Sequence, residues 1–144
     1  MKSYVCVVYQ YDSKIAIFGQ ARTPEGIGVA CEPWILLSDN LGAEVVGQAA
    51  HLAARGVSHS VTLESSPSDK ELLRFLGARS WKNFAPGAKS VHVILRNDSA
   101  TVVPYRPGEK HAFFPQHELA ITTSQEAREL GIAILESLGK QGPT

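Results

Sequence analysis

The sequence between residues 89 and 138 restricts the fold more than any other part of the chain. It contains two strand-like runs on either side of an Asn97-Asp98-Ser99 turn, a third run that ends at Ile121, and an amphipathic helix. Strands joined by short turns pair antiparallel, and their apolar face has to be covered by another layer. We therefore predict an α+β fold in which a mainly antiparallel sheet carries helices packed on it.

The first third of the chain shows a similar order of elements. Residues 3–11 are apolar on both alternating faces, which is typical of a central strand covered on both sides. A polar break follows, and residues 14–22 return as the second strand of a hairpin. The next run, residues 27–37, is interrupted by Pro33, which predicts an edge strand or a bulge because proline cannot donate a ladder hydrogen bond. Residues 58–63 are predicted as a further strand.

Three helices are predicted from capping residues and from apolar residues at helical spacing. The first follows the polar residues 38–40 and ends near Gly56, and its apolar stripe contains Leu41, Val45, Ala49, Leu52 and Ala53. The other two begin at capping boxes, in which a Ser or Thr side chain caps the helix and a Glu follows three residues later. These boxes are Ser68 with Glu71 and Thr123 with Glu126.

The length of 144 residues is typical of one domain and allows one sizeable core. We predict a single domain over residues 1–144, with pseudo-halves at about residues 1–79 and 80–144 that form a tandem strand-strand-strand-helix repeat. An offset of 84 places residues 35–38 on 119–122 and Gly47 on Gly131, and an offset of 86 places residues 12–13 on 98–99. The identities are few, so duplication and chance agreement both explain them.

The charges balance over the whole chain but not along it. Lys plus Arg and Asp plus Glu number 14 each, so no net field attracts nucleic acid or an anionic membrane, and we expect neither partner. Residues 1–72 contain five basic and eight acidic residues, and residues 73–144 contain nine and six. A partner with a basic surface would therefore prefer the first half if its acids share a face. Scattered, solvated charges are the alternative interpretation.

Cys6 and Cys31 are the two cysteines, and each lies inside an apolar strand-like run. A reduced thiol behaves there as a small hydrophobic side chain, and a disulfide between the two is the alternative interpretation. The first residues lack the pattern of a signal peptide, and no apolar run reaches the roughly 18 residues of a membrane span. We therefore expect the protein in the cytoplasm, where free thiols persist.

The chain carries no arrangement of residues typical of a catalytic or metal site. Its five histidines show no metal-ligand spacing, and its cysteines lie in predicted core strands rather than at a helix N-terminus. Residues 26–28 lack the third glycine of a dinucleotide-binding loop, and residues 58–60 lack a nucleophile elbow. We therefore predict no catalytic residue, cofactor or metal and no enzyme activity. The alternative is a small cytoplasmic hydrolase or transferase whose site is assembled from distant segments.

Ile132 has no evident role in the predicted core. At about 100° per residue it projects opposite Leu130 and Ile134, on a helix face that is otherwise charged. A single exposed isoleucine is ordinary, but it also marks a candidate contact with a second protein, with another copy of this chain, or with another layer of the same molecule.

Several segments between residues 72 and 138 share the rhythm of apolar positions of a known family. They are residues 72–77, Ser80-Trp81, Phe84, Val91-His92-Val93, residues 102–105 and Glu129-Leu130-Gly131. Together they resemble the immunity proteins of contact-dependent growth inhibition systems, which are small bacterial proteins that neutralise a toxin domain delivered by a neighbouring cell. The resemblance covers about half of the chain and contains no reactive motif.

This resemblance implies a non-enzymatic protein that binds over the active site of its cognate toxin domain, as a 1:1 heterodimer. Such toxins are often nucleases with basic substrate grooves, so an acidic surface could replace the phosphates and speed association. The candidate partner-binding residues are Glu25, Glu32, Asp39, Glu64, Asp69 and Glu71, together with Ile132.

Overall fold

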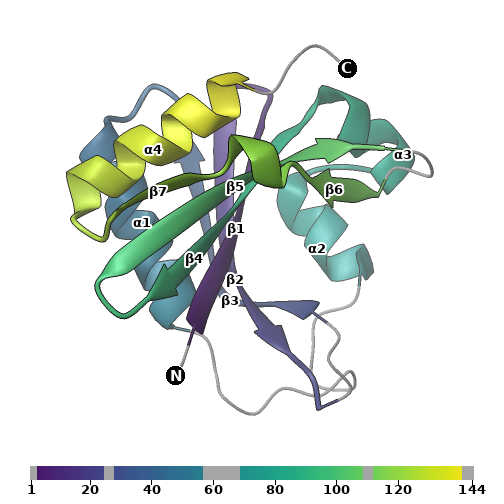
Figure 1. The fold of residues 1–144 in the computed structure, drawn as a ribbon. Coiled ribbons are helices and arrows are strands. Elements are labelled where there is room, and N and C mark those ends of the chain that lie inside the picture. The colour runs from purple at the N-terminus through teal and green to yellow at the C-terminus, as the bar shows by residue number, and fades with distance from the viewer. Residues whose placement is uncertain (1–2, 25–27, 57–68, 109–111, 141–144) are drawn as a thin grey trace.

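The computed structural model describes residues 3–24, 28–56, 69–108 and 112–140. These residues form one α+β domain around a seven-stranded sheet in which every strand pair is antiparallel, so the predicted fold class is confirmed (Figure 1). The predicted strand at residues 58–63 and the candidates Glu25 and Glu64 lie outside the described residues, as does Ser68 of the first capping box.

The sheet is ordered β3-β2-β1-β4-β5-β6, and β7 pairs with β5 beside β6. Its strands are β1 (Ser3–Tyr11), β2 (Lys14–Arg22), β3 (Gly28–Ser38), β4 (Lys89–Arg96), β5 (Ser99–Pro107), β6 (Phe113–Pro115) and β7 (Ile121–Ser124). The predicted central position of β1 is confirmed, since it pairs with β2 on one side and with β4 on the other. The two parts of the chain are thereby joined through the middle of the sheet.

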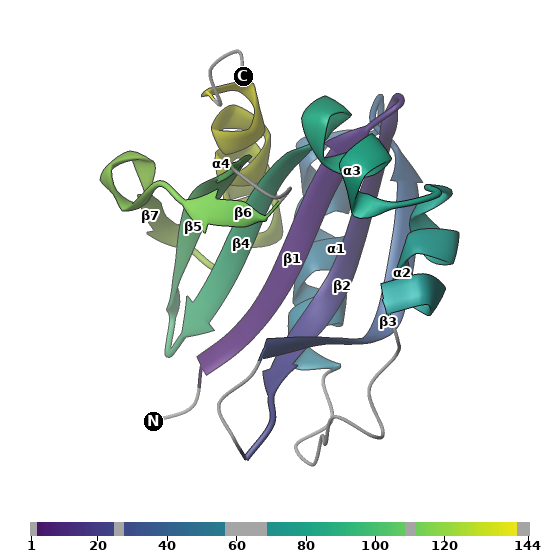
Figure 2. The same ribbon diagram turned by 90° about the vertical axis from the view of Figure 1, so that its right-hand side faces the viewer.

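Helices cover both faces of the sheet. They are α1 (Ala43–Arg55), α2 (Asp69–Leu76), α3 (Trp81–Phe84) and α4 (Ala127–Lys140), with short 3-10 turns at Ala85–Gly87 and His117–Leu119. Figure 2 shows α1 and α4 behind the sheet and α2 and α3 in front of it. One core lies under α1 and α4, and a second, rich in aromatic side chains, lies under α2 and α3.

Pro33 has the predicted effect on the edge of the sheet. Strand β3 is the edge strand, and its register with β2 shifts between Phe18 and Gly19, which face Trp34 and Cys31 respectively. Two residues, Glu32 and Pro33, are therefore left without partners in β2, as expected where proline cannot donate.

The predicted caps of α1 and α4 were wrong. Ser38 ends β3 opposite Lys14, and α1 begins five residues beyond it, at Ala43, with Gly42 as a cap that has no side-chain bond. Thr123 likewise pairs with Ala100 in the sheet, and the Glu126 carboxylate itself accepts the Glu129 N–H at 2.8 Å. In both places the strand includes a polar residue, Ser38 or Thr123, that a capping argument assigns to the helix.

The number of residues that separates equivalent positions of the two pseudo-halves differs from one element to another. The β1–β2 turn at residues 12–13 corresponds to the β4–β5 turn at residues 97–98, so the offset is 85 and the predicted 86 was wrong. The third strand of each half is β3 or β7, and its last residue pairs with the first residue of β2 or β5: Ser38 with Lys14, and Ser124 with Ser99. Ser38 and Ser124 are therefore equivalent, and the offset between them is 86 rather than the predicted 84. Duplication of the chain stays a prediction.

The helices keep the predicted offset of 84, and their contact is reciprocal. A Cβ on Gly47 would lie 1.8 Å from the Ala127 carbonyl oxygen, and a Cβ on Gly131 would lie 1.7 Å from that of Ala43. Each glycine therefore lets the backbone of the other helix approach closely.

The two thiols are too far apart for a disulfide. Cys6 and Cys31 both face Gly19 of β2, one from each side, so two strand spacings of about 4.8 Å separate their backbones. The resulting distance of roughly 10 Å exceeds the Cα separation that a disulfide tolerates. Both cysteines are free and buried.

Candidate partner-binding surface

The four described acidic candidates lie on two elements. Glu32 is exposed on the edge strand β3, and Asp39 follows that strand, where its N–H donates to the Ser13 carbonyl at 3.0 Å. Asp69 and Glu71 are exposed on α2. Figure 2 shows β3 and α2 near one another at one edge of the sheet, while Asp39 lies beyond the end of β3, beside the β1–β2 turn.

Neighbouring charges distinguish these two elements. The exposed residues of α2 include Lys70 and Arg74 as well as its two acids, so its field is mixed. The segment from residue 28 to residue 54 instead contains Glu32, Asp39 and Glu44 and no lysine or arginine. The acidic character predicted for the first half is thus concentrated in β3, α1 and their connection.

Large apolar side chains are also exposed on these elements, and here the sequence interpretation was wrong in part. Of the predicted apolar stripe, Ala49 and Ala53 are buried, whereas Leu41, Val45 and Leu52 are 39%, 39% and 65% exposed. The buried face of α1 is made instead of small residues and one valine: Val46, Gly47, Ala49, Ala50, Ala53 and Ala54. Small side chains are needed there because α1 lies close to both α4 and the sheet.

Two of the remaining large exposed apolar residues lie elsewhere. Ile132 is 41% exposed on the outer face of α4, as its helical position predicts, and Phe114 is 51% exposed on β6. Leu36 of β3 is 47% exposed and belongs with the residues of the edge strand. Exposed, large apolar residues are therefore concentrated on β3 and α1 rather than around Ile132.

A pocket of about 350 Å³ opens at the same edge of the sheet. It is lined by Glu32, Pro33, Trp34 and Gly56, which brings together the bulge of β3 and the end of α1. The Trp34 ring packs 5.1 Å from that of Phe75 on α2. Its indole Nε1 is buried and has no hydrogen-bond acceptor among the described residues.

A second pocket, of about 250 Å³, lies between the β1–β2 turn and the segment joining α2 to α3. Its lining includes Tyr11, Asp12, Arg79 and Asn83. Burial, and secondarily the Asp12 carboxylate, raises the pKa of Tyr11 above its ordinary value. The phenol therefore stays protonated near neutral pH and can donate a hydrogen bond, but it is not a base there.

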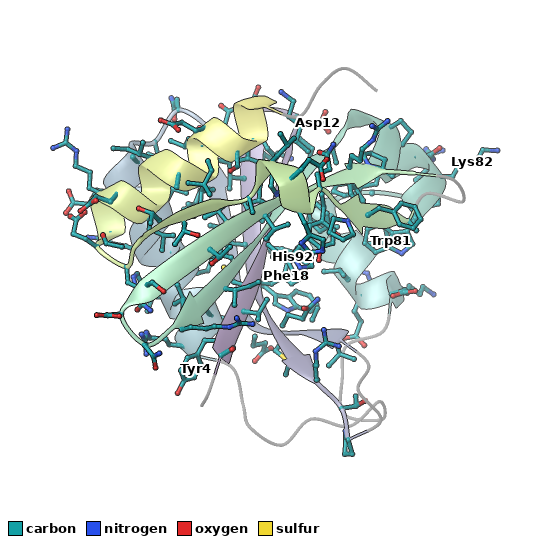
Figure 3. All side chains as sticks on the ribbon, in the orientation of Figure 1. Tyr4, Asp12, Phe18, Trp81, Lys82 and His92 are labelled. Carbon is teal, nitrogen blue, oxygen red and sulfur yellow. The ribbon has the colours of Figure 1, made fainter. Side chains whose placement is uncertain are left out.

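The buried titratable groups of the core are held in their neutral forms. Burial raises the pKa of the Cys6 thiol to about 12, so it is not the thiolate that nucleophilic catalysis needs. His92 lies in one row with Val7 and Phe18 across three strands (Figure 3), and its ring stacks on Tyr105 with centroids 3.7 Å apart. Burial lowers the pKa of His92 to about 4.

The free energy of unfolding should therefore decrease at acidic pH because of His92. Its pKa falls from 6.5 in the unfolded chain to about 4 in the folded protein, so between these values the unfolded state binds more protons. Stability is full above pH 6.5 and is expected to fall by up to about 3 kcal/mol as the pH drops to 4. Urea unfolding at pH 7 and 4.5 measures the change. His92→Phe, which keeps the stacked ring, should lose less stability than the unaltered protein, and an equal loss in both would contradict this assignment.

Two general properties follow from the described part of the chain. It contains no group of three or more His, Cys, Asp or Glu residues that could hold a metal ion. None of its helices combines the length and the apolar character needed to cross a lipid bilayer.

No protein-family model matches the sequence, and no curated protein sequence matches it either. Solved structures do share the fold. A protein of unknown function from Neisseria meningitidis is similar with a TM-score of 0.75 and 15% identity, covering 96% of this chain and 95% of that one. A chain of the CdiA-CT/CdiI toxin and immunity complex from Yersinia pseudotuberculosis is similar with a TM-score of 0.75 and 13% identity, covering 96% and 97%. The protein therefore has, over almost its whole length, the fold of a chain from a toxin and immunity complex.

Proposed function

We propose that this protein is an immunity protein that binds and neutralises a cognate toxin domain. The observation that carries this proposal is the shared fold, which extends over 96% of this chain and 97% of a chain from a toxin and immunity complex. The resemblance in residues 72–138 and the fold similarity thus support the same class of protein.

The finer features of the partner are also part of the proposal. We propose a nuclease toxin whose basic groove is blocked by this protein in a 1:1 complex in the cytoplasm. The acidic segment from residue 28 to residue 54 supports a basic partner, because complementary charge speeds encounter and suppresses wrong partners. The sequence suggests Glu25, Glu32, Asp39, Glu64, Asp69, Glu71 and Ile132 as candidate contact residues, of which a single docking face would use only a part.

The residue chemistry supports a binding protein more than the alternative hydrolase or transferase. Enzyme sites place titratable groups with pKa values near their working pH in a cleft. Here the pKa values of Cys6 and His92 are shifted to about 12 and about 4, away from neutrality. The shifts stabilise neutral, buried forms, as in a structural core.

Co-expression tests the proposal. The toxin domain encoded by the adjacent upstream gene is expressed in cells with this protein, with an unrelated immunity protein as control. We expect growth to be rescued only by this protein, and the two chains to co-purify. Absence of rescue would contradict the proposal. Rescue without a complex would favour the enzyme, since an enzyme could reverse the damage without binding the toxin.

A further inference from the structure

We infer that the toxin docks on one defined face, here named the β3–α1 flank. The flank comprises the exposed side chains of Leu41, Val45 and Leu52 and the pocket lined by Glu32, Pro33, Trp34 and Gly56. The inference rests on the proposed function, and it selects this flank over the α2 and Ile132 surfaces.

The flank is continuous along α1. At about 100° per residue, Val45, Leu52 and Gly56 lie within roughly 40° of one another around the helix. Gly47, which meets α4, lies on the other side of the helix, so these three positions face away from α4. With a rise of about 1.5 Å per residue, the line from Val45 to Gly56 is about 16 Å long. It leads from the apolar side chains into the pocket.

Two large apolar side chains of α1 face solvent, which is unusual for a surface helix. Four alanines, a glycine and Val46 face the core, while Val45 and Leu52 are exposed. Surface helices usually show the opposite arrangement, with large apolar residues in the core and polar residues outside. An exposed apolar strip that leads into a pocket is typical of a protein-binding site.

The pocket supplies an anchor point at the end of this strip. Its volume of about 350 Å³ is sufficient for one large side chain of a partner. The buried Trp34 Nε1 beside it lacks an acceptor among the described residues, which is unusual for a buried donor. A partner side chain with an acceptor could bind this donor if the indole shifts slightly on docking.

The charges indicate the chemistry of the partner. The segment from residue 28 to residue 54 has three carboxylates and no lysine or arginine. The Arg55 guanidinium lies 5.1 Å from the Tyr4 ring and donates to Gln125 at 2.8 Å, and the Lys14 ammonium lies 6.0 Å from the Tyr11 ring. The flank therefore suits a protein domain with an apolar contact patch bordered by lysine and arginine. The Ile132 face is less suitable, because one apolar side chain is surrounded there by charges of both signs.

The test compares matched variants in calorimetric titrations against the purified toxin domain encoded upstream. Val45→Lys with Leu52→Lys puts two cations on the flank, and Ile132→Lys puts one on α4. All three side chains are partly exposed, so the variants should fold, which circular dichroism checks. We expect the double variant to weaken the affinity by about 100-fold or more and Ile132→Lys to change it by less than about 3-fold.

Different results would overturn the inference and the proposed function. If the unaltered protein binds and the double variant binds equally well, the flank is wrong while the proposed function stands. A large loss with Ile132→Lys alone would also overturn the flank. If the unaltered protein does not bind the toxin domain at all, the proposed function fails. Sedimentation of the unaltered protein and the double variant tests whether the flank is instead a self-association surface. A dimer that the double variant converts to a monomer would show self-association on the flank and contradict toxin docking there.

Discussion

Replacing Gly47 or Gly131 with alanine is expected to destabilise the protein by about 3 kcal/mol. The added methyl group would lie 1.8 Å or 1.7 Å from a carbonyl oxygen of the opposite helix, and backbone atoms cannot rotate away as a side chain would. Relief therefore requires α1 and α4 to separate, which opens the core beneath them. Chemical denaturation followed by circular dichroism measures the loss.

Gly139→Ala is the matched control on α4. A Cβ at Gly139 would meet nothing within 4 Å, so only helix propensity changes there. Alanine is favoured over glycine in a helix by up to about 1 kcal/mol, so this variant should be neutral or slightly more stable. Equal effects at positions 47, 131 and 139 would show that the helices do not meet at their glycines.

Leu130→Ala is expected to cost about 2–5 kcal/mol, whereas Ile132→Ala on the same helix should cost less than about 0.5 kcal/mol. Leu130 is completely buried between α4 and the sheet, so its truncation leaves a cavity. Ile132 is 41% exposed, and its truncation leaves none. Unfolding in urea compares the two free energies directly.

The comparison also tests the description of Ile132 as a surface residue. A large loss of stability from Ile132→Ala would mean that it belongs to the core of the isolated protein. It could then no longer be considered as a contact for a partner. A small effect for Leu130→Ala would contradict the packing of α4 on the sheet.

Much of the fold could be predicted from the sequence because local signals and packing agree. In β1, apolar residues on both faces indicate a central strand, and both faces are indeed covered. Pro33 correctly predicts a bulged edge, because proline has no backbone N–H to donate to a neighbouring strand, wherever in a sheet it lies. The predicted helix caps were wrong because Ser and Thr fit a strand as well as a cap. Ser38 and Thr123 pair with neighbouring strands, and only the tertiary structure decides between the two roles.

The candidate site was less predictable for a different physical reason. Helical spacing identifies an apolar stripe on α1, but its larger members Val45 and Leu52 face solvent, because the close contact with α4 and the sheet favours glycine and alanine. Nothing in the periodicity distinguishes a leucine face from an alanine face as the buried one. The acidic candidates Glu32 and Asp39 could be found from charge alone, although the pocket that Glu32 forms with Gly56 depends on the packing of β3 and α1.

We propose above all that this protein binds a toxin domain. Calorimetric titration of the purified domain encoded by the adjacent upstream gene into this protein tests that proposal most directly. We expect a 1:1 complex with a Kd below about 1 μM at moderate salt. The affinity should weaken as salt rises, because the carboxylates of Glu32, Asp39 and Glu44 contribute to it. Absence of binding between the two folded proteins at micromolar concentrations would contradict the claim.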